Sequence, residues 1–233
     1  MAQRCFALIP AAGAGARAGA PSPKQYVPLN GEAMLVHTIR AFVRSPAIAG
    51  LRVVLAADDA WGGSADAASI RAEAGVRLGF DQVGGATRAQ SVANGLEALA
   101  KDASADDWVL VHDAARPCIT PAMIGGLIDT LAHDPVGGLL AWPVPDTLKR
   151  ADATGRVEAT IAREGLWLAQ TPQMFRFGVL RAAYAAAPDV TDEAGAVEAL
   201  GHAPRLCLGS ARNLKVTYAA DFDLAAAYLR WAG

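Results

Sequence analysis

A stretch of small residues near the N-terminus carries two cations. Residues 10–19 are almost all Pro, Ala and Gly, with Arg17 among them, and Pro23-Lys24-Gln25-Tyr26 follows shortly after. Glycines such as Gly13 allow a sharp turn and bring bare backbone N–H groups close to a ligand. Because Arg17 and Lys24 add full positive charge beside those amides, the segment is typical of a polyphosphate-binding loop.

The same loop also matches a dinucleotide-binding fingerprint at residues 13–18. That fingerprint requires a helix directly at the loop and an acid at the end of the next strand. Prolines at 21, 23 and 28 argue against an immediate helix, whereas Asp58 and Asp59 do follow the second predicted strand. A dinucleotide-dependent oxidoreductase therefore stays open as an alternative.

A lone carboxylate ends an apolar strand in the middle of the chain. Asp113 follows the run 108–112, and Arg116 lies three residues further on. Asp113 could hold Mg²⁺, which binds to few carboxylates together with phosphate oxygens, or it could cap the next turn. Arg116 could lie near phosphates or pair with Asp113. The four histidines and three cysteines form no triad, zinc or disulfide pattern.

The elements around these residues alternate between strands and helices. Apolar runs predict strands at 5–9, 51–56, 76–80 and 108–112, and helical periodicity predicts helices at 32–45, 88–100 and 121–133. Helices at 178–187, 191–200 and 219–231 and strands at 205–208 and 214–217 complete the chain. This order predicts an α/β fold, a mostly parallel sheet with helices on both faces. Ligands bind at the carboxyl ends of such strands, where the glycine loop, Gly84-Gly85 and Asp113 fall.

The pattern changes at about 139–163, where short extended pieces at 139–144, 147–150 and 157–161 follow without a helix. Asp152-Ala-Thr-Gly155 is a good turn between the last two. An inserted hairpin has little core of its own, so it forms either a flap on its own domain or an arm that meets a second subunit. With no linker or repeat, residues 1–233 read as a single domain with this excursion.

Composition restricts the class of protein. The formal net charge is −2, so there is no overall basic surface and we expect no nucleic-acid partner. No apolar run approaches bilayer length, and Pro10 with the glycines interrupts the weak likeness of the N-terminus to a signal peptide. Cys5, Cys118 and Cys207 are odd in number and widely spaced, which favours free thiols in a reducing compartment. We therefore expect a cytoplasmic protein without a membrane partner.

The loop resembles that of the sugar nucleotidyltransferases, and Pro23-Lys24-Gln25-Tyr26 narrows the likeness to the 2-C-methyl-D-erythritol 4-phosphate cytidylyltransferases. Further segments match that family in order and over nearly the whole chain. They are Gly84-Gly85 with Arg88 and Ser91, Val111–Pro117, Asp146–Lys149, Thr171-Pro172-Gln173, Thr191-Asp192-Glu193 and Asn213–Thr217.

The resemblance implies a fold, a reaction and an assembly. The fold is the three-layer, Rossmann-like nucleotidyltransferase fold, with the hairpin as a dimerisation arm. The reaction transfers CMP from CTP to 2-C-methyl-D-erythritol 4-phosphate with Mg²⁺ or another divalent cation. The assembly is a homodimer with sites shared across the interface.

The resemblance also implies a role for individual residues. Arg17 and Lys24 would be catalytic, and Asp113 would bind the metal. The CTP site would comprise Ala11, Ala12, Gly13, Gly84, Gly85, Ser91, Asp113, Ala114 and Arg116. The second substrate would be positioned by Thr147, Arg163, Thr171 and Lys215, the first two acting in the partner's site.

Two positions depart from the family pattern, and other functions remain to be separated. Ala86 and Arg212 stand where relatives often carry an acid. At Ala86 this argues against a side-chain contribution to base selection, and at Arg212 it argues against a second metal ligand. Asp192 and Glu193 are left out of the site, because a helix capped by Thr191 explains acids in its first turn. A cytidylyltransferase for another polyol phosphate, such as ribitol 5-phosphate, and a non-catalytic nucleotide sensor remain alternatives.

Overall fold

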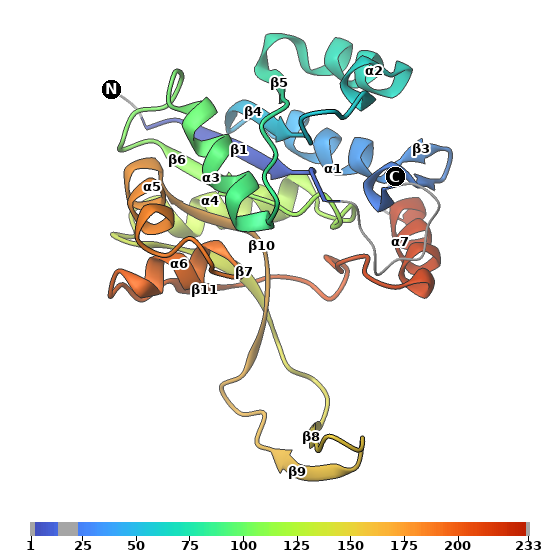
Figure 1. The fold of residues 1–233 in the computed structure, drawn as a ribbon, viewed down its shortest axis with the longest axis vertical. Helices are drawn as coiled ribbons and strands as arrows, with labels where there is room; N and C mark the ends of the chain where they lie inside the picture. The colour runs from blue at the N-terminus through green and yellow to red at the C-terminus, as the bar shows by residue number, and fades with distance from the viewer. Residues whose placement is uncertain (1–2, 14–22, 232–233) are drawn as a thin grey trace.

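The computed structural model describes residues 3–13 and 23–231. A seven-stranded sheet lies at its centre in the order β11-β7-β10-β6-β1-β4-β5 (Figure 1). Its strands are β1 (Cys5–Pro10), β4 (Ile48–Val54), β5 (Leu78–Asp81), β6 (Trp108–Val111), β7 (Gly137–Pro143), β10 (Trp167–Arg176) and β11 (Arg205–Leu208).

Most neighbouring strands are parallel. β1 pairs in parallel with β4 and β6, β4 with β5, and β7 with β11, whereas β10 runs antiparallel to β6 and β7. The carboxyl ends of β1, β4 and β6 therefore meet at one edge of the sheet, as the βα order predicts.

Helices cover both faces of this sheet. Ala7 and Ile9 of β1 belong to the core cluster formed with α1 (Met34–Val43), α2 (Ala65–Ala74) and α4 (Pro121–Leu131). Phe6 and Leu8, which alternate with them, belong to the cluster formed with α3 (Arg88–Leu99), α5 (Phe177–Ala186) and α6 (Glu193–Ala199). Side chains of a strand alternate between its two faces, so the three-layer α/β fold predicted from the sequence is confirmed.

A third, smaller cluster places the last helix. Ala225 of α7 (Ala219–Trp231) packs with Leu29, Met34, Cys118 and Val216. This packing keeps residues 214–217 beside the body of the protein, close to the carboxyl end of β6.

The excursion predicted at about 139–163 contains a projecting hairpin, here called the arm (Figure 1). Its first residues, 139–141, are instead buried in β7 of the central sheet, and the arm continues to the exposed start of β10 at 167–168. Its tip strands β8 (Leu148–Ala151) and β9 (Val157–Ile161) pair with each other in antiparallel fashion. The turn between them is stabilised by Asp152, whose Oδ1 accepts hydrogen bonds from the backbone N–H groups of Thr154 and Arg156 at 2.8 and 3.0 Å.

Several local predictions were wrong. Residues 214–217 form no strand: Val216 donates a backbone hydrogen bond to Ala115, which lies in no strand. The helix predicted at 32–45 begins at Met34, since β2 (Pro28–Leu29) and β3 (Glu32–Ala33) form a small hairpin. Asn30 and Gly31, at φ 50° and 93°, make its turn.

Besides β2 and β3, the strand β10 and the helix α2 were not predicted. β10 contains Pro172, which hides it from a search for alternating strands. α2 has an Ala-rich, weakly amphipathic sequence, and its clearest signal is Ser64, whose Oγ accepts a hydrogen bond from the N–H of Ala67 at 3.1 Å. Within residues 3–13 and 23–231, no helix has both the length and the apolar character that crossing a membrane requires.

Candidate active site

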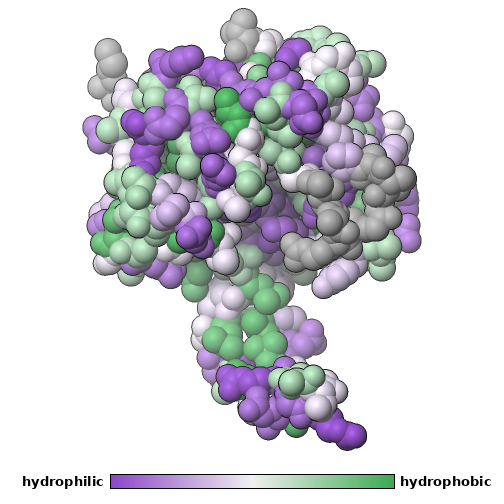
Figure 2. Space-filling view, in the orientation of Figure 1, coloured by the Kyte–Doolittle hydropathy of each residue, from purple (hydrophilic) through white to green (hydrophobic). Residues whose placement is uncertain are grey.

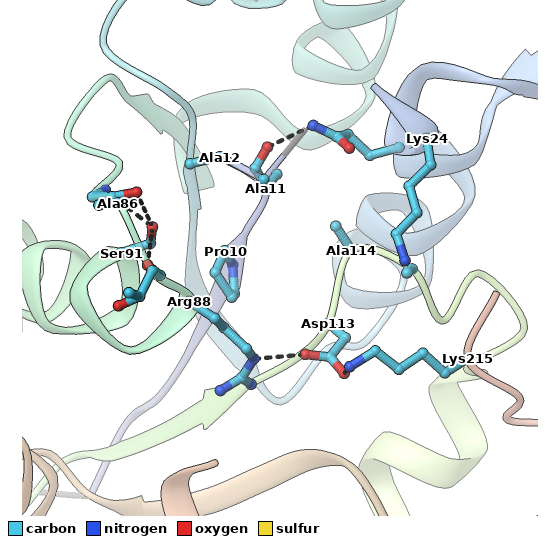
Figure 3. Close-up of a pocket in the computed structure, with 15 residues that line it drawn as sticks. Pro10, Ala11, Ala12, Lys24, Ala86, Arg88, Ser91, Asp113, Ala114 and Lys215 are labelled. Atoms are coloured by element: carbon cyan, nitrogen blue, oxygen red, sulfur yellow. Dashed lines mark hydrogen bonds and ion pairs between the residues drawn. The ribbon is translucent and has the colours of Figure 1, made fainter. Parts of the chain in front are cut away.

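A pocket of about 390 Å³ opens at the carboxyl ends of β1 and β6 (Figure 3). This volume suits a small-molecule ligand. Its lining combines small residues with three cations and one carboxylate. The lining residues are Pro10, Ala11, Ala12, Gly13, Lys24, Gln25, Gly85, Ala86, Thr87, Arg88, Ser91, Asp113, Ala114, Ala115 and Lys215.

One wall of the pocket is made of backbone and small side chains. Ser91 Oγ accepts a hydrogen bond from the N–H of Gly85 at 3.0 Å and donates one to the carbonyl oxygen of Thr87 at 2.9 Å. A Cβ at Gly84 would lie 2.7 Å from the carbonyl oxygen of Leu55, so only glycine lets this loop lie against the end of β4. Gly84 therefore supports the wall without lining it.

The opposite wall carries charge around Asp113. Its Oδ1 accepts a hydrogen bond from Arg88 Nε at 2.9 Å, and its Oδ2 lies 2.9 Å from Lys215 Nζ and 3.6 Å from Arg116 Nε. Burial alone raises the pKa of this carboxyl, but the charges of Arg88, Lys215 and Arg116 outweigh it and hold the pKa well below its usual range. Asp113 is therefore an ionised group at neutral pH.

A buried hydrogen-bond chain fixes the backbone of Asp113. Its N–H donates to Thr171 Oγ1 at 3.0 Å, so the Thr171 hydroxyl is left to donate to His112 Nδ1 at 3.0 Å. His112 Nε2 then carries the proton and donates to the carbonyl oxygen of Arg116 at 3.2 Å. Burial lowers the pKa of His112 to about 4, which keeps the ring neutral. Thr171 thus supports Asp113 from behind and does not line the pocket.

The two lysines of the pocket come from distant parts of the chain. Lys24 Nζ donates to the carbonyl oxygen of Val216 at 2.9 Å, which joins the Pro-Lys-Gln-Tyr segment to the one that bears Lys215. That second segment is anchored by buried Asn213, whose amide donates to the Thr171 carbonyl oxygen at 2.8 Å. Arg116 Nη1 donates to the Asn213 carbonyl oxygen at 2.7 Å.

Other predicted site residues lie elsewhere. Arg116 is buried against Asp113 and Asn213 and does not line the pocket. Thr147 and Arg163 are exposed in the arm, where Arg163 donates to the carbonyl oxygen of Pro145. Arg17 lies outside the described residues. Arg212, one of the two positions expected to depart from the family pattern, has its guanidinium 6.0 Å from the ring centroid of Tyr228.

Sequence reasoning missed two charged residues of the site, Arg88 in the lining of the pocket and Glu193 behind it. Arg88 joins Asp113 to Glu193, whose carboxylate accepts from both Nη atoms at 2.8 and 3.1 Å and is fully buried. The N-cap of α6 is Asp192 rather than Thr191, because Asp192 Oδ1 accepts from the Gly195 N–H at 2.9 Å. The sequence analysis left Glu193 out of the site because an acid in the first turn of a helix needs no further explanation. Both Arg88 and Glu193 lie in segments that match the family, and that match was the signal that could have identified them.

The pocket fits a divalent cation only through Asp113. No cluster of three or more potential metal-ligating side chains occurs among residues 3–13 and 23–231. Mg²⁺ needs few protein carboxylates when phosphate oxygens supply the remaining ligands. The ionised Asp113 provides one such carboxylate, so the donor set fits Mg²⁺ once Lys215 or Arg88 releases an oxygen.

Comparison with known proteins agrees with this architecture. The sequence model of the family described as 2-C-methyl-D-erythritol 4-phosphate cytidylyltransferase matches residues 5–231. Proteins of that name from Dechloromonas aromatica (strain RCB) and Laribacter hongkongensis (strain HLHK9) are each 56% identical to this chain. Each alignment covers 97% of this chain, and 98% and 96% of the respective relatives.

Solved structures agree as well. A crystal structure of 4-diphosphocytidyl-2C-methyl-D-erythritol synthase has a TM-score of 0.85 at 40% identity, covering 98% of this chain and 99% of that one. The 2-C-methyl-D-erythritol 4-phosphate cytidylyltransferase from Francisella tularensis has a TM-score of 0.79 at 32% identity, covering 97% and 100%. The chain belongs to the 2-C-methyl-D-erythritol 4-phosphate cytidylyltransferase family.

Proposed function

We propose that this protein transfers CMP from CTP to 2-C-methyl-D-erythritol 4-phosphate, which gives 4-diphosphocytidyl-2-C-methyl-D-erythritol and pyrophosphate in the non-mevalonate route to isoprenoid precursors. Membership of the family over residues 5–231 carries this conclusion. The pocket supports it, because a small-residue wall suited to a pyrimidine faces a charged wall suited to phosphates.

The reaction needs charge neutralisation more than proton transfer. An anionic phosphate oxygen of the acceptor attacks the α-phosphorus of CTP, a new P–O bond forms, and the bond to the leaving pyrophosphate breaks. The nucleophile needs no strong base, so positioning and cations aimed at the developing charge are the main levers. Lys24 and Lys215 both line the pocket, and Arg17 would join them from the loop.

Mg²⁺ completes the proposed site. A bound divalent cation would supply positive charge that offsets the charge of the phosphates. Asp113 is the residue that would hold it, and its low pKa keeps it available as a ligand at neutral pH. Arg88 and Lys215 pair with Asp113 and would compensate its charge before the metal arrives.

Asp113→Asn tests this assignment. The variant keeps the shape of the side chain but loses its charge, so we expect the Mg²⁺ concentration for half-maximal pyrophosphate release to rise by about tenfold or more. EDTA should abolish the release. Mg²⁺ titration of CTP binding by calorimetry gives a second readout, and an unchanged metal requirement in both assays would reject Asp113 as the ligand.

We further propose a homodimer in which Thr147 and Arg163 serve the partner's pocket. The arm carries exposed apolar side chains, among them Val157, Leu166, Trp167 and Leu168, and apolar residues gather along it in Figure 2. A second subunit would cover both this apolar surface and the strand edges of the hairpin.

The three buried, free cysteines support the cytoplasmic location expected from the sequence.

Pyrophosphate release tests the function directly. With CTP we expect turnover on 2-C-methyl-D-erythritol 4-phosphate and little on ribitol 5-phosphate. CTP should be strongly preferred over ATP and GTP, because we assign the wall at Gly85 and Ser91 to a pyrimidine base. Equal turnover with ATP would reject the cytosine assignment, and preferred turnover on ribitol 5-phosphate would reject the acceptor.

A further inference from the structure

The buried carboxylate of Glu193 has no part in the transfer step described above. One side chain, that of Arg88, connects it to the pocket. Glu193 Oε1 accepts hydrogen bonds from Arg88 Nη1 at 2.8 Å and from the Tyr184 hydroxyl at 2.7 Å, and Oε2 accepts from Arg88 Nη2 at 3.1 Å. Arg88 lines the pocket and donates from Nε to Asp113 at 2.9 Å. A continuous chain of contacts thus leads from Tyr184 on α5 to Asp113.

The backbone that carries Glu193 is fixed independently of Arg88. Gln173 of β10 accepts a hydrogen bond from the Ala194 N–H at 2.7 Å and donates to Asp192 Oδ2 at 3.0 Å. Asp192 also caps the helix through the Gly195 N–H. The contacts with β10 and the Asp192 cap fix the first turn of α6 without help from Arg88, so the Glu193 carboxylate can hold the longer and more flexible Arg88 side chain.

We propose that Glu193 is a positioning residue for nucleotidyl transfer, an inference that rests on the proposed function. By binding both terminal nitrogens of Arg88, it leaves only Nε to orient Asp113 and offsets positive charge that would otherwise act on the triphosphate. A bidentate contact fixes the plane of a guanidinium group. Without the carboxylate, Arg88 is free to turn its terminal nitrogens toward Asp113 or the phosphates.

Loss of the charge at Glu193 should therefore change ground-state binding and turnover in opposite directions. In Glu193→Gln we expect CTP to bind more tightly in EDTA, on the order of tenfold, because one negative charge near the triphosphate is gone. We expect kcat for Mg²⁺-dependent pyrophosphate release to fall by a similar factor, because Asp113 is less well oriented. Calorimetry and steady-state kinetics measure the two quantities.

Glu97→Gln is the matched control. Glu97 on α3 and Arg181 on α5 form a bidentate pair with both hydrogen bonds at 2.8 Å. This pair lies outside the pocket and joins the same two helices that carry Arg88 and Tyr184. The control should keep wild-type CTP affinity and kcat. A purely structural role for Glu193 predicts unchanged or weaker CTP binding in Glu193→Gln, and that result would overturn the proposal.

Arg88→Lys tests the proposal even if Glu193→Gln fails to fold. Lysine keeps the positive charge but lacks the planar fork that holds two carboxylates at once. We expect metal-free CTP affinity within about twofold of wild type and a kcat reduced on the order of tenfold. A wild-type kcat would refute the positioning role.

The outcomes separate this inference from the proposed function. If the wild-type protein released no pyrophosphate from CTP and the methylerythritol phosphate, the proposed function would fail and this inference with it. If the wild type were active and the Glu193 and Arg88 variants behaved like it, this inference alone would be rejected.

Discussion

Lys24 is the residue whose loss should affect catalysis most clearly. Its Nζ lies in the pocket and donates to Val216, at the side of the segment that also bears Lys215. Removing one preorganised group that stabilises transition-state charge costs about 10²–10³-fold in turnover. We expect a loss of that size in Lys24→Ala with the fold retained, and the same in Arg17→Ala.

Lys101→Ala provides the control for Lys24, because Lys101 is exposed and lies outside the pocket. Pyrophosphate release measures turnover, and circular dichroism checks the fold. A loss smaller than tenfold in well-folded Lys24→Ala would remove Lys24 from the catalytic group.

His112 should make the stability of the protein depend on pH in a defined window. Burial lowers its pKa to about 4 in the folded protein, against 6.5 for the unperturbed side chain. Below pH 6.5 the unfolded chain therefore binds the proton first, and the free energy of unfolding falls as the pH drops toward 4. The full shift corresponds to about 3 kcal/mol.

Urea unfolding at pH 7, 5.5 and 4.5 measures this effect of His112. The decline should be distinctly shallower in His112→Gln, which has no group that titrates in this range. The comparison is between pH slopes, because the substitution also disturbs the hydrogen bond to Thr171. Equal slopes in the two proteins would show that His112 stays protonated or becomes exposed.

The loops at the strand ends depend on close backbone approach. Gly84 follows β5, and a Cβ at this position would lie 2.7 Å from the carbonyl oxygen of Leu55. Gly84→Ala must therefore move the loop that carries Gly85 and the wall of the pocket. We expect a loss of about 1–3 kcal/mol in the free energy of unfolding and a higher KM for CTP.

Gly126→Ala is the matched substitution on α4, where a Cβ meets nothing within 4 Å. Alanine in this open helical site should stabilise the protein by about 0.5–1 kcal/mol and leave KM unchanged. Chemical unfolding and CTP kinetics on both variants test the contrast. Parallel behaviour of the two alanine variants would contradict the close approach at Gly84.

The spacing of apolar residues correctly predicted the elements that bury one regular face. It failed for elements whose buried residues do not follow a regular spacing. Leu35, Ile39 and Phe42 are spaced for a helix and are all fully buried on α1. β10 escaped because Pro172 breaks its strand pattern, and its pairing with β7 is irregular between Ala169 and Gln173. The same irregular segment carries Thr171, which supports Asp113. A functional constraint thus replaced the regular pattern that sequence reasoning relies on.

At the scale of the whole molecule, the sequence indicated which segments carry function. It did not indicate which side chains of those segments contact one another. Lys24, Arg88, Asp113 and Lys215 come from four separate segments and meet in one pocket. The order of βα units predicts this meeting at the strand ends, because parallel strands share a carboxyl edge. The partners of Glu193 could not be predicted, since its contact with Arg88 joins residues 105 positions apart.

The arm leads to a prediction about the assembled protein. Thr147 and Arg163 lie in a hairpin whose tip strands pair with each other, away from the pocket of their own chain (Figure 1). If Arg163 serves the partner's site while Lys24 serves its own, a dimer of one Lys24→Ala chain and one Arg163→Ala chain contains one doubly defective site and one intact site.

Reassortment of these two inactive variants should therefore restore activity. Random pairing makes about half of the dimers mixed, and half of the sites in those dimers are intact, so roughly a quarter of wild-type activity should return. The variants are unfolded together and refolded, mixed dimers are verified by native mass spectrometry, and pyrophosphate release is assayed. Each variant refolded alone is the control and should stay inactive. If both residues act within one chain, every site keeps a defect, so absence of recovery in verified mixed dimers would leave the arm as a structural contact between subunits.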